Sequence, residues 1–206
     1  MKTLFPLGFA LVLFVFCGCS QREELAARLS EERRVAESKA PANPSEFLEA
    51  AMRGDQSAVS ALIERGIDVN VLDEEGRSAL QLASFDGHHE VVTLLLKRGA
   101  NVDHIDAKGR TALMFASTGP HLETVELLIK AGASLDAIDH EEHFTALMFA
   151  AAEGQTEVVK ALLRAGADPD LRDVDGDSAL TFASQNGHAE VVSLLESVTD
   201  ADPAPR

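Results

Sequence analysis

The sequence predicts an all-α solenoid, built from helix-turn-helix units of about 33 residues that are joined by hairpin tips. The first observation is repetition, because the segment that opens at Asp73 returns at Asp106, and further copies open at Asp139 and Asp173. The second observation is that turn residues divide each copy into two short apolar stretches. Two helices of that length cannot bury their apolar faces alone, so neighbouring units must stack.

Each copy opens with a turn and a helix cap. In the first full copy, residues 73–76 read Asp-Glu-Glu-Gly, in which Asp can bond its own backbone and Gly accepts a positive φ. A hydroxyl residue then stands at the N-cap, where it can accept a free helix N–H; these residues are Ser78, Thr111, Thr145 and Ser178. Gln81 follows Ser78 at the spacing of a capping box. A first helix is therefore predicted from Ala79, ending near Gly87.

The second helix of each copy is almost wholly apolar. In the first full copy it is predicted to start at Glu90, whose charge suits the positive end of a helix. Residues 91–96 leave only Thr93 polar, so this helix must be covered on most sides. Lys97 and Arg98 then place cations at the negative end, and a glycine follows at the C′ position.

Five units are predicted, and the first is partly disguised. Residues 45–72 contain helices at 47–51 and 58–63 but no turn-and-cap segment, and their polar outer residues suit an end cap. The predicted boundaries are 1–18 for a lipoprotein signal peptide, 19–44 for a polar tether, 45–199 for one repeat domain with units 45–72, 73–105, 106–138, 139–172 and 173–199, and 200–206 for a disordered tail.

The repeated strings resemble the ankyrin repeat, whose signature is about 33 residues containing Thr-Pro-Leu-His-x-Ala. The matching strings are Ser78-Ala-Leu-Gln, Thr111-Ala-Leu-Met, Thr145-Ala-Leu-Met and Ser178-Ala-Leu-Thr. Gly-His before the second helix and Gly-Ala-Asp after it also match, at Gly87-His88, Gly187-His188, Gly99-Ala-Asn101 and Gly166-Ala-Asp168. The resemblance covers about three-quarters of the chain. It implies an ankyrin-repeat solenoid that binds a protein partner.

Departures from the family pattern are expected to have local effects. Ala replaces the usual Pro at the first helical position of the four full copies. The usual His is also missing, so the hydrogen bond that it commonly makes in the family is expected to be absent. Pro120 stands where Gly87 stands, and because Pro lacks an N–H and fixes φ, the turn between the two helices should differ there. The fold itself should not change.

The N-terminus resembles the leader of a bacterial lipoprotein. Residues 4–16 form an apolar run that is too short to span about 30 Å of hydrocarbon but suits a secretory leader. The small Gly18 precedes Cys19, which implies that Cys19 carries the lipid, palmitate included, although Phe16 departs from the usual Leu. A serine directly after this cysteine, here Ser20, resembles the pattern in lipoproteins that are sent to the outer membrane. The protein would then face the periplasm. An ordinary cleaved leader and an uncleaved membrane anchor are the alternatives.

Residues 21–44 are interpreted as a tether that holds the repeats away from a membrane. Glu24 with Arg28, and Arg28 with Glu32, are i,i+4 pairs that support a solvated helix. A coiled coil through Leu25 and Leu29 is an alternative, and the sequence leaves open whether the tether is helical or disordered.

Composition and motifs argue against several functions. A net charge of −16 repels phosphate backbones, so nucleic acid is not an expected partner. The sequence has no dinucleotide fingerprint, phosphate-binding loop or catalytic serine string, so neither an enzyme nor a cofactor is predicted. His140 and His143, with the two glutamates between them, are the best metal-ligand candidates. The alternative is a solvated turn, because a tetrahedral site would need fixed ligands from elsewhere.

The resemblance implies that a partner binds to the concave face and to the hairpin tips. Phe85 stands at a position that faces this groove in the family, so it is an aromatic anchor candidate, with core packing as the alternative. Three phenylalanines at the position of Leu82 are expected to fill the core: Phe115, Phe149 and Phe182. The candidate tip residues are Glu75, His104, Lys108, His140, Glu142 and Asp175.

The expected protein is a monomer that binds another, unidentified protein and performs no reaction. A scaffold, a protective protein of the cell envelope and an immunity protein that neutralises a toxin all fit the sequence. A metal-dependent role through the hairpin histidines and a purely structural envelope component are alternatives from other classes.

Overall fold

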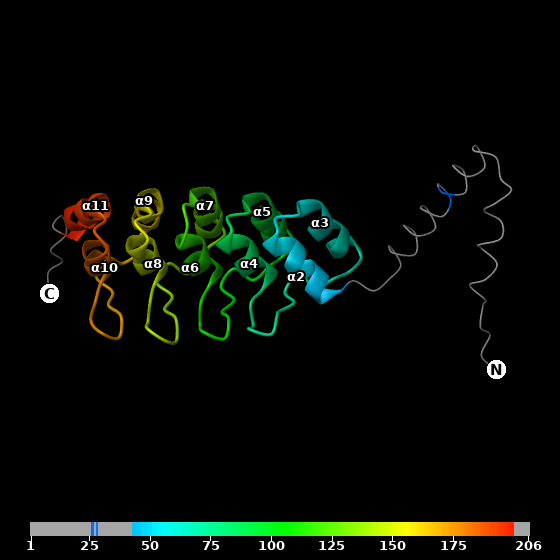
Figure 1. Ribbon diagram of the computed structural model, residues 1–206, viewed down its shortest axis with the longest axis horizontal. Coiled ribbons are helices and arrows are strands. Elements are labelled where there is room, and N and C mark those ends of the chain that lie inside the picture. Colours follow the sequence, from blue (N-terminus) through cyan, green and yellow to red (C-terminus); the bar gives the residue numbers. More distant parts are fainter. Residues whose placement is uncertain (1–25, 27, 29–42, 200–206) are drawn as a thin grey trace. The chain divides into compact units, whose positions relative to one another are not determined.

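The computed structural model describes residues 43–199 together with Ala26 and Arg28. The chain divides into two compact units, Met1–Pro41 and Ala42–Arg206, and the second contains all the labelled helices (Figure 1). The predicted leader, Cys19 and the tail at 200–206 lie outside the described residues, as does the tether apart from Ala26, Arg28, Asn43 and Pro44.

The described residues form ten helices and no strand, which confirms the predicted all-α fold class. They follow one another as antiparallel pairs, with four hairpins on one side of the row (Figure 1). The pairs are α2 (Pro44–Met52) with α3 (Gln56–Glu64), α4 (Ala79–Phe85) with α5 (His89–Lys97), α6 (Ala112–Ser117) with α7 (Leu122–Lys130), α8 (Ala146–Ala152) with α9 (Thr156–Ala165), and α10 (Ala179–Gln185) with α11 (Ala189–Thr199).

Helix starts follow the predicted capping chemistry. The Ser78 hydroxyl accepts the N–H of Gln81, and the Gln81 side chain in turn accepts the N–H of Ser78, which completes the predicted capping box of α4. Thr111, Thr145 and Ser178 accept an N–H in the same way at α6, α8 and α10. Within residues 43–199 no hairpin precedes α2, and Asn43 caps this helix.

Gln81 corrects one expectation drawn from the resemblance. The family's usual His is missing, and its hydrogen bond was expected to be absent from every copy. Gln81 stands at that position, and its amide donates to the carbonyl oxygens of His104 and Arg110 at 3.2 and 2.6 Å. A longer polar side chain therefore supplies a link between neighbouring units at this position.

The second helices supply much of the core. In α5, Val91, Val92 and Leu95 are at most 1% exposed, and their equivalents in the other units are also buried apart from Ala58 and Val192 in the two end units, which are partly buried. The core is continuous from Phe47 in α2 to Leu195 in α11, because each helix pair packs on the next one. This continuity is the burial that a single unit could not achieve alone.

The turn at Pro120 differs from the others, as predicted. In the fourth unit, Gly154 and Gln155 donate their N–H groups back to the carbonyls of Ala151 and Ala150. Pro120 has no N–H to donate, and α6 is one residue shorter than α4. The helix pair α6–α7 still stacks between its neighbours, so the fold is unchanged.

The four hairpins form a row, which we call the hairpin row; its tips are residues 73–77, 106–110, 139–144 and 173–177. One backbone hydrogen bond joins each neighbouring pair of tips: Ala107 N–H to Glu75 O (3.0 Å), His140 N–H to Lys108 O (2.8 Å) and Val174 N–H to Glu142 O (3.1 Å). The inserted residue lengthens the third tip, and there His143 takes a positive φ of 61°. Among the described helices, none has both the length and the apolar content needed to cross a membrane.

Candidate functional site

The groove face is formed by the hairpin row and the first helix of each unit, namely α2, α4, α6, α8 and α10. Phe85, the last residue of α4, is 51% exposed on this part of the molecule. Its ring meets the edge of the Phe115 ring, with 6.0 Å between ring centroids. Phe85 is therefore supported by a neighbouring aromatic ring but is not buried in the core. A fixed, half-exposed aromatic side chain has the properties of a binding anchor.

Phe85 lines an apolar hollow with a volume of about 310 Å³. Its other lining residues come from three units and combine apolar side chains with two arginines: Met52, Arg77, Gln81, Leu82, Asp86, Arg110 and Phe115. The hollow is large enough for one apolar side chain of a partner, and the arginines could meet polar groups beside that side chain.

Both arginines are held in place by carboxylates. Arg110 donates from Nε and one terminal nitrogen to Asp106, at 3.1 and 2.8 Å, and its guanidinium lies 4.6 Å from the centre of the Phe115 ring. Arg77 donates from Nε to Asp73 at 2.7 Å, and this hydrogen bond raises the pKa of Arg77, so its guanidinium stays charged. The cations are pre-oriented, which lowers the ordering cost of binding.

A second aromatic cluster lies further along the groove face. Phe144 packs against Phe149 and Phe182, with ring centroids 5.4 and 4.8 Å apart. Phe115 is nearly buried, as predicted, whereas Phe149 and Phe182 are only partly buried and pack against the edge of the core. Sequence reasoning missed Phe144. The inserted residue in the third tip brings it to the position that Arg77 and Arg110 hold in earlier units, and counting from Thr145 would have found it.

Five of the six predicted tip residues, His140 among them, are exposed to solvent, whereas His104 is partly buried. Glu75 pairs with Arg77 at 3.1 Å, and Lys108 pairs with Glu141 of the next tip at 3.1 Å. Glu142 and Asp175 are also exposed, and their backbone N–H groups donate to the aspartates that open their own tips. These side chains are available to a partner, but they are spread along the hairpin row rather than gathered at the hollow.

The two predicted tip histidines connect neighbouring hairpins. A ring nitrogen of His104 lies 2.7 Å from the carbonyl oxygen of Gly76, in the preceding tip. The ring of His140 packs so closely on Gly109 that a Cβ there would lie 2.5 Å from it. Within the part of the chain that the structure describes, no group of three or more metal-ligating side chains is arranged to hold an ion.

Comparison with known families gives one match. A family model described as Ankyrin repeats (3 copies) matches residues 47–139 and again residues 136–204. These two matches together span most of the chain, including nearly all of the ten helices. No curated protein matches the sequence.

Proposed function

Because the chain belongs to the ankyrin repeat family, whose members generally mediate protein–protein binding, we propose that it binds one protein partner through its groove face and hairpin tips without catalysing a reaction. The observation that carries the proposal is Phe85, which stands half exposed over a hollow that also contains two fixed arginines. Aromatic and arginine side chains are the residue types most enriched where binding energy concentrates.

The energetics of binding favour this use of the face. Helix packing fixes the groove face before a partner arrives, so little conformational entropy is lost on association. The formal net charge of −16 favours a partner whose surface carries basic residues around an apolar residue. Electrostatic attraction of that kind raises the association rate, whereas the aromatic contacts set how long the complex lasts.

We also propose that a lipid on Cys19 anchors this module to a bacterial membrane. Three features of the sequence support this proposal: the leader is apolar, the small Gly18 precedes Cys19, and Cys17 is the only other cysteine in the sequence. The outer membrane, with the repeats facing the periplasm, is the proposed location. There the module would act as a scaffold, as a protector of an envelope protein or as the immunity partner of a toxin.

The binding proposal is tested by crosslinking in intact cells, followed by affinity purification and mass spectrometry. The same purification is repeated with Phe85→Ala and with Val198→Ala, a control at an exposed apolar residue in α11. A partner that is retained by the parent and by Val198→Ala but lost from Phe85→Ala supports the groove face. A partner retained equally by both variants excludes Phe85 as its anchor.

The anchoring proposal is tested by labelling cells with radioactive palmitate. Cys19→Ala should abolish incorporation, whereas Cys17→Ala should leave it intact because the bulky Phe16 precedes Cys17. Continued labelling of Cys19→Ala would refute the assignment of the lipid to that residue.

A further inference from the structure

The hairpin row is incomplete at its first end. At each of three junctions, a residue in one tip donates its N–H to a carbonyl of the preceding tip. The donors are Ala107, His140 and Val174, and the residue that stands at this position in the first tip is Glu74. Within residues 43–199 no hairpin precedes α2, and the Glu74 N–H has no acceptor there. It is an open backbone donor at the edge of the row.

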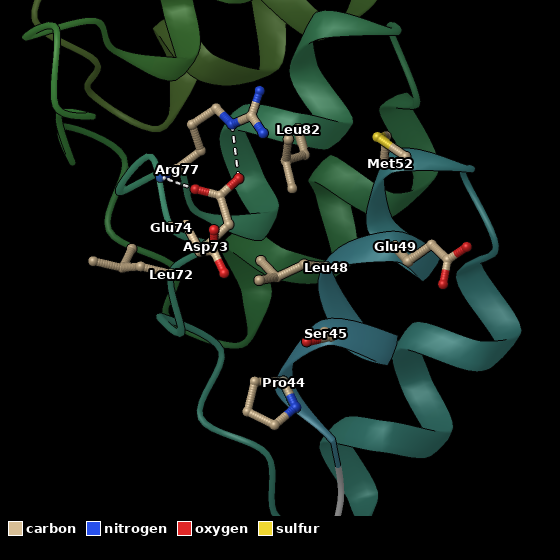
Figure 2. A pocket seen from close by; sticks show the side chains of 10 residues that line it. All are labelled: Pro44, Ser45, Leu48, Glu49, Met52, Leu72, Asp73, Glu74, Arg77 and Leu82. Atoms are coloured by element: carbon tan, nitrogen blue, oxygen red, sulfur yellow. Dashed lines mark hydrogen bonds and ion pairs between the residues drawn. The ribbon is translucent and has the colours of Figure 1, made fainter.

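An apolar hollow lies beside this open donor, between α2 and the first tip. Its volume is about 430 Å³. Figure 2 shows Leu48 extending from α2 toward the hairpin, with Pro44 and Ser45 at one end of α2 and Met52 at the other. Leu72 and Met52, which also line it, are 46% and 45% exposed, about as much as Ile105 and Phe85 at the same positions one unit later. The hollow and the open donor, rather than this exposure, distinguish the first end of the row.

The charged residues around the hollow indicate what kind of partner segment would bind there. The residues that line the hollow include three acids, Glu49, Asp73 and Glu74, and one base, Arg77, but the Glu49 carboxylate is already paired with Arg53 at 3.0 Å. Arg77 is already bound to Asp73 and Glu75, whereas the exposed Glu74 carboxylate has no ion-pair partner among the described residues. The free charge at this end of the row is therefore negative, and it favours basic groups on the occupant.

A second copy of the chain is a poor occupant on the same grounds. Stacking end to end would bring the last tip of one molecule against the first tip of another. The last tip contains Asp173, Asp175 and Asp177, so carboxylates would face carboxylates. Like charges at a contact disfavour that pairing.

We propose that an extended segment of a protein partner, with alternating basic and apolar residues, docks at this end and extends the hairpin row. One of its backbone carbonyls accepts the Glu74 N–H, an apolar side chain fills the hollow beside Leu48 and Leu72, and a lysine or arginine meets Glu74. Extended peptides bind to the edges of β-sheets by a similar combination of backbone hydrogen bonds and side-chain pockets, although here a single backbone donor is open. The inference rests on the proposed function only in requiring that the occupant is a protein.

The hollow adjoins the groove face, because Met52, Arg77 and Leu82 line both hollows. A segment docked at the first tip would therefore lead toward Phe85. The partner would therefore bind in one orientation, with its extended segment at the first unit and the rest of the partner over the later units.

The test uses fluorescein-labelled peptides and the full-length chain held in nanodiscs of zwitterionic lipid, and empty nanodiscs measure the peptide that binds lipid alone. The probes are a short peptide that alternates lysine with leucine, one that alternates lysine with serine, and one that alternates glutamate with leucine. Fluorescence anisotropy should show the tightest binding for the lysine–leucine peptide. Equal binding of the lysine–serine peptide would overturn the proposal, because charge alone would then account for the affinity.

Variants locate the site. Glu74→Pro removes the N–H at the second position of a turn closed by Gly76 N–H to Asp73 O, a position where proline is well accommodated. It should weaken binding of the lysine–leucine peptide about fivefold more than Glu74→Ala, which keeps the N–H. Leu72→Ser should weaken binding, whereas Ile105→Ser, at the same position one unit later and 44% exposed, should not. An equal loss in both serine variants would refute the site.

Phe85→Ala separates this inference from the proposed function, because Phe85 does not line the first hollow. Peptide binding should survive that substitution even if capture of the cellular partner fails. Loss of peptide binding in Phe85→Ala would place the peptide on the groove face and overturn the first-end site. Unchanged helical circular dichroism in each variant confirms that binding, rather than folding, was altered.

Discussion

Gly154 provides a sharp test of how neighbouring units are fixed to one another. It lies in the turn between α8 and α9 with a φ of +69°. A Cβ at this position would lie 2.5 Å from Nδ1 of His188, in the next unit. The same imidazole is held by its other nitrogen, Nε2, which lies 2.9 Å from the carbonyl oxygen of Ala152. Two features therefore require glycine at this position: the positive φ of the backbone and the close approach of the His188 ring.

The expected cost of Gly154→Ala follows from these two requirements. A left-handed conformation costs a residue with a Cβ about 1–2 kcal/mol, and loss of backbone freedom in the unfolded chain offsets about 0.4–1 kcal/mol of that. Displacing the ring also breaks its hydrogen bond to Ala152, which adds about 0.5–1.5 kcal/mol. Gly166, with a φ of +100° and open space within 4 Å of where a Cβ would stand, carries only the first requirement. Gly154→Ala should therefore lose about 1 kcal/mol more stability than Gly166→Ala.

Urea unfolding followed by circular dichroism, on a chain lacking residues 1–19, measures both losses. The decisive comparison is Gly154→Ala made in a His188→Ala background, where no ring remains to be displaced. The excess cost should vanish there, and the double-mutant cycle should give an interaction energy of about 1 kcal/mol. Equal costs of Gly154→Ala in both backgrounds would refute the contact as the source of the effect.

Three further predictions concern other positions in the stack. Leu95→Ala should lower the free energy of unfolding by about 2–5 kcal/mol, because Leu95 is fully buried; a shift in melting below about one degree would contradict the stacked core. Thr124→Val should raise stability by about 1 kcal/mol, because the buried Thr124 Oγ1 has no hydrogen-bond partner and Val91 fills the equivalent place in α5; an unfolding midpoint below that of the parent would contradict this. The N–H of Ala58, and then the Ser57 hydroxyl, lower the pKa of the Asp55 carboxyl at the start of α3. The stability that this depressed pKa contributes is present above the unfolded value near 3.8 and is lost as pH falls through the folded value, so Asp55→Asn should flatten the stability profile in acid; an unchanged acid profile would exclude Asp55 as its source.

Helix positions could be predicted from the sequence because their causes are local. The Ser78 hydroxyl and the Gln81 side chain bond each other's backbone across a single turn, so their spacing is visible in the sequence. Gly87 and Gly99 adopt the positive φ that ends a helix, and they stand where the predicted boundaries were placed. The absence of turn residues from the first copy was equally visible in the sequence.

The candidate site could be predicted only in part, because its contacts join residues about one unit apart. Phe85 was found because it interrupts a pattern of small or polar residues. Its support from Phe115, and the hold of Asp106 on Arg110, depend on how closely two units approach each other. Periodicity predicts that units stack, but it does not give the side-chain partners across the junction. The apolar hollow beside α2 was missed for the same reason.

Contacts across junctions nevertheless leave a trace in the sequence, in the form of paired changes. At three junctions, the histidine that begins the second helix of one unit packs on a glycine of the preceding unit. The three pairs are Gly54 with His88, Gly87 with His121 and Gly154 with His188. At the remaining junction Pro120 takes the place of glycine, and Gln155 takes the place of histidine. At the other three junctions a Cβ in place of the glycine would lie 2.2 to 2.5 Å from the imidazole, so a proline at this position is not compatible with a histidine in the next unit. Reading a repeat sequence by such pairs, rather than copy by copy, therefore predicts which side chains meet between units.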